Sequence, residues 1–158
     1  MSRQEIIFEL QRYFQIYELV GKWTYRVHKE RAWKFFSTDA LLMLLIIRKN
    51  IGRKITINTW FWGGGFSQRG LRTNVQNLFR QFFLLGKLYL SGHVLGEAFD
   101  FDVEGMSSSE VRSWIKANQI LFPFKVRLEC NKKGKPINWV HADVIQENHN
   151  PKIYEFDV

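Results

Sequence analysis

Cysteine, long apolar runs and internal repeats are scarce or missing in this sequence. The single cysteine, Cys130, excludes an intramolecular disulfide. The apolar run Leu41–Ile47 has seven residues, far short of the roughly 20 that a helix needs to cross a bilayer. The N-terminus has no basic region followed by an apolar core and a cleavage site, so no secretory signal is expected. We therefore expect no transmembrane segment and no intramolecular disulfide in these residues.

What is present fits one packed domain. The chain has 158 residues, of which 46% are hydrophobic and 16% aromatic, enough for a sizeable core. We expect a single monomeric domain over residues 1–158, with residues 1–36 as a helical extension packed on it. A protein with a net charge of +8 is attracted to polyanions such as wall polymers, nucleic acid or acidic lipid. No base-reading motif is present, so nucleic acid is not an expected partner.

Three helices can be placed from their apolar spacing and their ends. Residues Gln4–Val20 carry apolar side chains at helical spacing. A second helix is expected to be capped at Ser37, to be buried, and to end near Gly52. Ser107 and Glu110 have the spacing of a capping box that opens a third helix.

Residues of the kinds that bind zinc gather in two segments, Ser91–Asp100 and Trp139–His141. Zinc accepts imidazole nitrogen and carboxylate oxygen, and a catalytic site uses three protein ligands and a water. His93, Asp100 and His141 would supply such a set. Each residue alone is more simply explained as a hydrogen-bonded core histidine or a solvated aspartate, but together they favour a metal.

The spacing of the first two candidate ligands constrains the backbone. On a straight helix His93 and Asp100 would lie about 10 Å apart along the axis, so they need a chain reversal between them. Gly92 and Gly96 favour that reversal. The following segment, Ala98–Val103, alternates apolar and polar residues as a half-buried strand does, with Asp100 on the polar side.

A second strand is expected to supply the third ligand. Residues Ile137–Val144 are rich in strand formers and place Trp139, His141 and Asp143 on one face. We expect that face to meet the polar side of the first strand.

The pattern Ser-x-His-x-x-Gly-x-Ala-x-Asp at 91–100, followed by Trp-x-His at 139–141, resembles the zinc D-alanyl-D-alanine carboxypeptidase family. That family also includes dipeptidases, the L-alanyl-D-glutamate endopeptidases of phage lysis enzymes, and the hedgehog signalling domain. The resemblance extends from about Thr38 to Val144. It implies that the three candidate ligands bind zinc. It also implies an α+β fold in which a small antiparallel sheet, flanked by helices, carries the zinc site.

The resemblance also assigns roles around the ligands. Arg72 corresponds to the family arginine that binds substrate and steadies the oxyanion, which suits a guanidinium because its charge is permanent and its donors form a planar fork. Leu71 stands where the family usually has tyrosine. Ser91 and Trp139 belong to the pattern itself and are expected beside the ligands or the substrate. Gln68 is expected to assist in binding the substrate.

The general base is where the chain departs from the family pattern. Family members usually carry Glu or Asp a few residues before the last histidine, yet Asn138 stands there. Glu129 is the preferred substitute. A hairpin centred on the intervening Lys-Gly step would set Glu129 opposite Asn138 or Trp139, and a slip of one residue would change its face. Asp143 is the rival base, or else a carboxylate that orients the ligand His141.

Together these expectations describe a zinc peptidase that acts on peptides of bacterial peptidoglycan. Zinc would lower the pKa of a bound water toward about 7, and Glu129 would take the water proton and deliver it to the leaving amine. The enzyme would be made in the cytoplasm and would reach the wall by another route, as phage lysis enzymes do. Two alternatives stay open: a zinc or cell-wall binding module without turnover, and a nucleic-acid binder driven by the basic N-terminal part.

Overall fold

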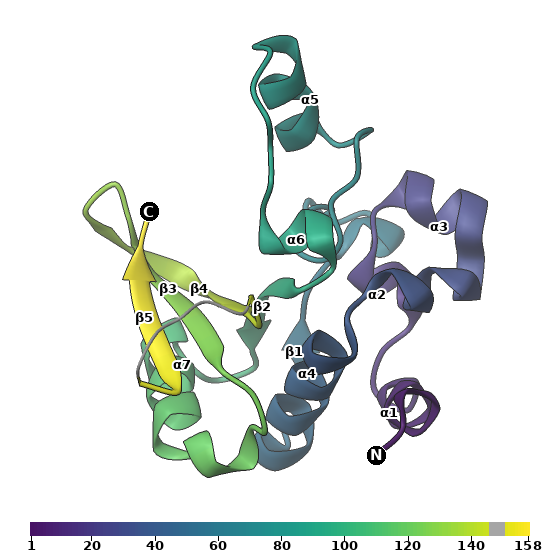
Figure 1. The fold of residues 1–158 in the computed structure, drawn as a ribbon. Helices are drawn as coiled ribbons and strands as arrows, with labels where there is room; N and C mark the ends of the chain where they lie inside the picture. The colour runs from purple at the N-terminus through teal and green to yellow at the C-terminus, as the bar shows by residue number, and fades with distance from the viewer. Residues whose placement is uncertain (146–150) are drawn as a thin grey trace.

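The computed structural model describes residues 1–145 and 151–158, and in that part of the chain seven α-helices accompany one five-stranded sheet (Figure 1). The α-helices are α1 (Arg3–Leu10), α2 (Ile16–Leu19), α3 (Lys22–His28), α4 (Thr38–Ile51), α5 (Asn77–Leu84), α6 (Gly92–Leu95) and α7 (Ser108–Ala117). Short 3-10 helices are η1 (Lys29–Phe35), η2 (Trp60–Trp62) and η3 (Gln119–Leu121). The strands are β1 (Ile55–Thr56), β2 (Ala98–Val103), β3 (Val126–Lys132), β4 (Lys135–Asp143) and β5 (Ile153–Asp157).

The sheet is mixed, which corrects the expectation of an antiparallel one. Its strand order is β1-β2-β4-β3-β5, and the first three pairings along that order are antiparallel. The last strand, β5, pairs in parallel with β3. A two-residue turn joins β3 to β4, and such a turn can only join antiparallel neighbours. Strand β5 follows β4 in the chain but pairs with β3, and it runs parallel to β3. The α+β composition stands, but the sheet is larger and less regular than expected.

The helix ends follow their capping residues. The Ser37 side chain accepts from the Ala40 backbone N–H at 3.1 Å, and Gly52 ends α4 in the left-handed conformation. Ser107 and Glu110 form the expected capping box of α7. Within the described residues, none of the helices combines the length and apolar character that crossing a membrane requires.

The expected helix over Gln4–Val20 is wrong as one continuous element. Helix α1 ends at Leu10, and α2 begins at Ile16. A second capping box separates them, because the Glu18 carboxylate accepts from the Gln15 backbone N–H at 2.7 Å and starts a new helix. Both helices nevertheless add buried side chains to the same core as α4 and the sheet.

Strand β2 separates the core from the site. Its residues Phe99, Phe101 and Val103 are buried in the hydrophobic core that also includes side chains of α4 and α7. Phe99 stacks on Phe36 with ring centroids 5.2 Å apart. Successive side chains of a strand point to opposite faces, so Asp100 lies on the other side of the sheet, as its alternation predicted.

Replacing Phe99 by Ala should lower the free energy of unfolding by about 3 to 5 kcal/mol, because a fully buried ring leaves a cavity. Urea denaturation of the metal-free protein measures this change. The matched control is Phe8→Ala, since Phe8 is 67% exposed, and it should change stability by no more than about 0.5 kcal/mol. Similar losses for the two variants would contradict this account of the core.

Candidate metal centre

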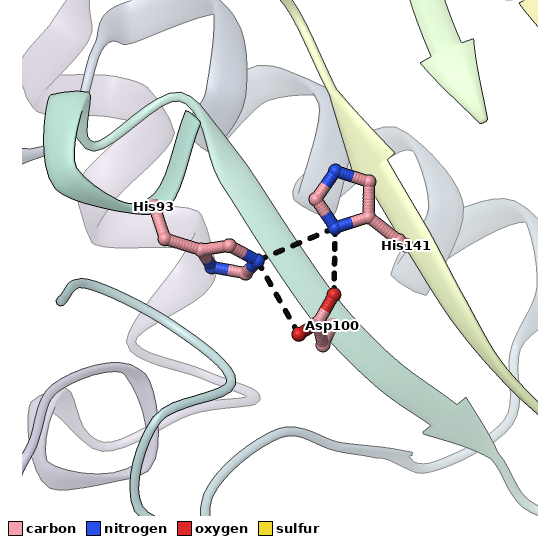
Figure 2. A group of neighbouring side chains, drawn as sticks. All are labelled: His93, Asp100 and His141. Carbon is pink, nitrogen blue, oxygen red and sulfur yellow. Dashed lines mark hydrogen bonds and ion pairs between the residues drawn. The ribbon is translucent and has the colours of Figure 1, made fainter. Parts of the chain in front are cut away.

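Three separate elements bring the candidate ligands together. His93 comes from α6, Asp100 from β2 and His141 from β4. Asp100 and His141 are direct partners in the antiparallel register of β2 and β4, so their side chains share one face of the sheet. Figure 2 shows His93 reaching toward both from its short helix. The predicted convergence of the three residues is confirmed, and all three are buried.

The distances between the ligand atoms suit one small ion. His93 Nε2 lies 3.3 Å from Asp100 Oδ2 and 3.3 Å from His141 Nδ1. A tetrahedral zinc with ligands at 2.0 to 2.2 Å would set them about 3.3 to 3.6 Å apart. The third distance, from His141 Nδ1 to Asp100 Oδ1, is 2.7 Å, a hydrogen-bond length. The two histidines contact different oxygens of Asp100, and one ligand atom from each of the three residues lies within 4.8 Å of the other two.

Both imidazoles are oriented by a second contact on the far side of the ring. His93 Nδ1 lies 2.8 Å from the Gly70 carbonyl oxygen, which can only accept, so Nδ1 carries a proton and Nε2 offers a lone pair. His141 Nε2 lies 3.2 Å from Asp143 Oδ2 and is fixed in the same manner. Ligand histidines in metal sites are typically held by a carbonyl or carboxylate in this arrangement. The donor set and its supports therefore fit a metal ion.

The expected chain reversal between His93 and Asp100 is also confirmed. Helix α6 lasts four residues and ends at Gly96, whose φ of +70° is left-handed. A Cβ at Gly96 would also lie 2.0 Å from the Phe35 carbonyl oxygen, so both conformation and space require glycine.

The segment 70–72, which supports His93 from behind, is packed as tightly. A Cβ added to Gly70 would lie 1.9 Å from the Leu19 carbonyl oxygen. This close approach lets Leu71 N donate to Leu19 O at 3.0 Å and Arg72 N donate to His93 O at 3.0 Å. Residues 70–72 therefore connect α6 to the N-terminal helices.

Burial and charge set opposite protonation states on the two histidines. Burial lowers the pKa of His93 and favours the neutral ring. Burial opposes charge on His141 as well, but hydrogen bonds to Asp100 and Asp143 outweigh it and raise the pKa of His141 to about 9. Burial would raise the pKa of Asp100, yet the two imidazoles hold that pKa far below its ordinary range. In the metal-free protein at neutral pH, His141 is therefore an imidazolium.

The three ligands face a cavity of about 610 Å³. Its walls include the predicted site residues Ser91, Trp139, Arg72 and Glu129. Among the described residues, Ser91 Oγ and one oxygen of Glu129, Oε1, are buried without a hydrogen-bond partner. Buried polar atoms normally have partners, so these two atoms mark places where a bound water or substrate would complete the site.

Glu129 reaches this cavity through a register that the sequence did not predict. The expected pairing with Asn138 or Trp139 is wrong, because Glu129 lies directly opposite His141. Glu129 pairs with His141, and the next pair along the hairpin is Asn131 with Pro136. Between these two pairs β3 advances by two residues, whereas β4 advances by five. The three extra residues form a bulge, and an odd shift moves Glu129 to the face of His141.

Arg72 lies beside the ligands, as predicted, and its guanidinium is held from three sides. It donates to the Gln68 carbonyl at 2.7 Å, to Tyr89 Oη at 2.9 Å and to Asp100 Oδ2 at 3.0 Å. Within residues 1–145 and 151–158 these contacts use three of the five N–H groups of an arginine and leave two for a bound group. Gln68 contributes through this carbonyl, because its side chain accepts from Leu78 N at 3.3 Å.

Asp143 is saturated by its neighbours. It accepts from Arg127 Nε at 2.8 Å and Nη2 at 3.1 Å, from Ile145 N at 3.1 Å, and faces His141 Nε2. These contacts fit the second role considered for Asp143, a carboxylate that orients the candidate ligand His141. Because both oxygens already accept hydrogen bonds, Asp143 is poorly suited to act as a base.

Sequence reasoning missed Tyr89 and Arg127. Tyr89 reaches Arg72 from the chain that returns from α5, and Arg127 reaches Asp143 across β3 and β4. Arg127 lies two residues before Glu129 on strand β3. Residues two apart on a strand share a face, and this spacing was the one signal that could have placed Arg127 on the same face as Glu129. No local pattern marks Tyr89.

A comparison of the chain with protein-family models, with curated proteins and with solved structures finds no match. The metal centre therefore stands on its own geometry: three convergent ligand atoms, two oriented imidazoles and an adjoining cavity.

Zinc affinity should rise with pH. Because the pKa of His141 in the free protein is raised to about 9, a proton occupies the ligand nitrogen at neutral pH and zinc must displace it. The apparent association constant should therefore rise about tenfold per pH unit between pH 7 and about 9, and flatten above the folded-state pKa. Competition with a chelator of known affinity measures it. An affinity independent of pH over this range would show that His141 is not charged in the free protein.

Compared above the His141 pKa of about 9, where a proton no longer competes for this ring, Asp143→Asn should weaken zinc binding by about 10- to 100-fold, because the amide holds the His141 ring less firmly than the carboxylate does. The matched control is Asp102→Asn on β2, where the carboxylate pairs with Arg69 and touches neither histidine. Chelator competition on both variants, with circular dichroism to check folding, gives the measurement. Equal affinities in a folded Asp143→Asn variant would refute the orienting role.

Proposed function

We propose that the protein is a zinc-dependent peptidase that hydrolyses stem peptides or cross-links of bacterial peptidoglycan, as D-alanyl-D-alanine carboxypeptidases or phage endolysins do. The observation that carries the proposal is the meeting of His93 Nε2, Asp100 and His141 Nδ1 at one point beside a cavity. The spacing of these residues in the sequence is that of the family motif. Zinc is proposed because two imidazoles and one carboxylate form a typical catalytic zinc set with one position left for water.

When bound, the ion would supply Lewis acidity that polarises a peptide carbonyl and activates water. The remaining chemistry falls to side chains of the cavity. Two observations support Glu129 as the group that accepts a proton from water: it lies opposite His141, and its Oε1 is buried with no hydrogen-bond partner among the described residues. The same carboxyl group then delivers this proton to the amine that leaves.

Two further groups are suited to holding the substrate. The free N–H groups of Arg72 can donate to the carbonyl oxygen on which negative charge develops, while the contacts to Tyr89 and the Gln68 carbonyl keep the guanidinium in place. Ser91 Oγ is buried and unpartnered among the described residues, so it can bind a polar group of the peptide backbone. The half-buried ring of Trp139 forms part of the apolar wall.

Glu129→Gln should keep zinc and lose at least about 100-fold in turnover, because an amide cannot accept the proton. Zinc content is measured by mass spectrometry of the metal, and turnover by mass spectrometry of digested peptidoglycan with and without a chelator. Glu155→Gln is the matched control, since Glu155 lies on the adjacent strand β5 and pairs with Lys116 at 2.9 Å. Full activity in the Glu129→Gln variant would remove Glu129 from the mechanism.

A second candidate is a zinc-bearing module of the same kind that binds wall peptides without cutting them. One observation favours it: Asn138 stands where the family pattern has its acidic residue. The same digestion separates the two functions. Zinc-loaded protein that sediments with purified peptidoglycan and releases no fragments would support the module and overturn the peptidase.

A further inference from the structure

The segment 77–90, which we term the α5 hairpin, carries an uncovered apolar tip. It consists of α5 and the chain that returns toward α6, and it projects from the rest of the molecule (Figure 1). At its tip Phe83, Leu84, Leu85 and Leu88 are between 69% and 82% exposed. Large apolar side chains gathered at one projecting point usually mark a surface that binds something.

The base of the α5 hairpin has a different role from its tip. Leu78, Phe82 and Tyr89 line the cavity of the metal centre. Phe82 stacks on Tyr89 with ring centroids 4.8 Å apart, and Tyr89 accepts from Arg72. The base is thus explained by the site, whereas the tip residues lie outside the cavity walls and have no such explanation.

The charges around the tip are all positive. Arg80 and Lys87 are exposed, and within the described residues neither forms an ion pair. No Asp or Glu occurs in the sequence between Asp39 and Glu97. The whole chain carries a net charge of +8. An apolar tip flanked by unpaired cations is complementary to a surface that is apolar inside and negatively charged outside.

We infer that the tip of the α5 hairpin docks on an anionic lipid bilayer. Phe83, Leu84, Leu85 and Leu88 would enter the boundary between headgroups and acyl chains, where apolar side chains are removed from water. Arg80 and Lys87 would remain at the level of the lipid phosphates. A projecting tip suits a bilayer better than a protein partner, because a fluid interface closes around any shape and needs no matching groove. Docking does not depend on the proposed hydrolysis, but it would hold the cavity close to the membrane through the base of the hairpin.

Co-sedimentation of the full chain with large unilamellar vesicles tests this inference. Vesicles of equal parts phosphatidylglycerol and phosphatidylcholine should bind the protein, and pure phosphatidylcholine should bind it more weakly. The double variant Phe83→Ser with Leu84→Ser should lower the partition coefficient at least about tenfold. Arg80→Gln with Lys87→Gln should remove most of the preference for phosphatidylglycerol and its sensitivity to salt.

The matched control is Ile120→Ser, because Ile120 is 86% exposed in η3, outside the α5 hairpin, and its loss should leave partitioning unchanged. Circular dichroism of the double variant checks that the fold is kept, and Leu88→Ser replaces it if the fold is lost. His141→Ala should lose zinc yet keep vesicle binding, which separates this inference from the peptidase proposal. Equal partitioning of wild type and a folded tip variant overturns the inference. So does a dimer that the tip variant converts to a monomer, because the tip would then bind a second copy of the chain.

Discussion

The pairing of Asp100 with His141 across β2 and β4 is the contact on which the candidate metal centre depends. It places two ligands side by side on a rigid sheet, so only one further ligand must come from elsewhere. His93 fills that role from a four-residue helix that is held by backbone hydrogen bonds from Arg72 N to His93 O and from Ser37 N to Gly96 O. Glu129 extends the same row one strand further. A site built on strands keeps its geometry better than one built on loops.

The protonation states of this cluster balance its buried charges. The proton on His141 Nδ1 lies between an oxygen of Asp100 and the lone pair of His93, where a cation would otherwise sit. Arg72 and Arg127 add positive charge against the two buried aspartates. Both buried aspartates therefore have compensating positive charge within the protein itself. A metal ion bound by these three residues would therefore take the place of this proton.

The parts of the site that the sequence predicted are those encoded within a few residues. The alternation of Ala98–Val103 gave the correct face for Asp100, and two glycines predicted the turn after His93. The partner of Glu129 could not be predicted, because the bulge in β4 is settled by packing between strands rather than by local pattern. The parallel strand β5 and the contact between Tyr89 and Arg72 join segments distant in the chain, for which periodicity carries no information.

The narrow space between Gly70 and Leu19 ties the metal centre to the beginning of the chain. The carbonyl that aligns His93 belongs to a backbone that rests on α2, and α2 in turn is anchored in the shared core. The first helices are thus part of the scaffold of the centre rather than an appendage to it. Any transfer of the three residues into another protein would therefore have to include segment 70–72 and the part of α2 that it contacts. Without them, His93 would lose the Gly70 carbonyl that orients its ring.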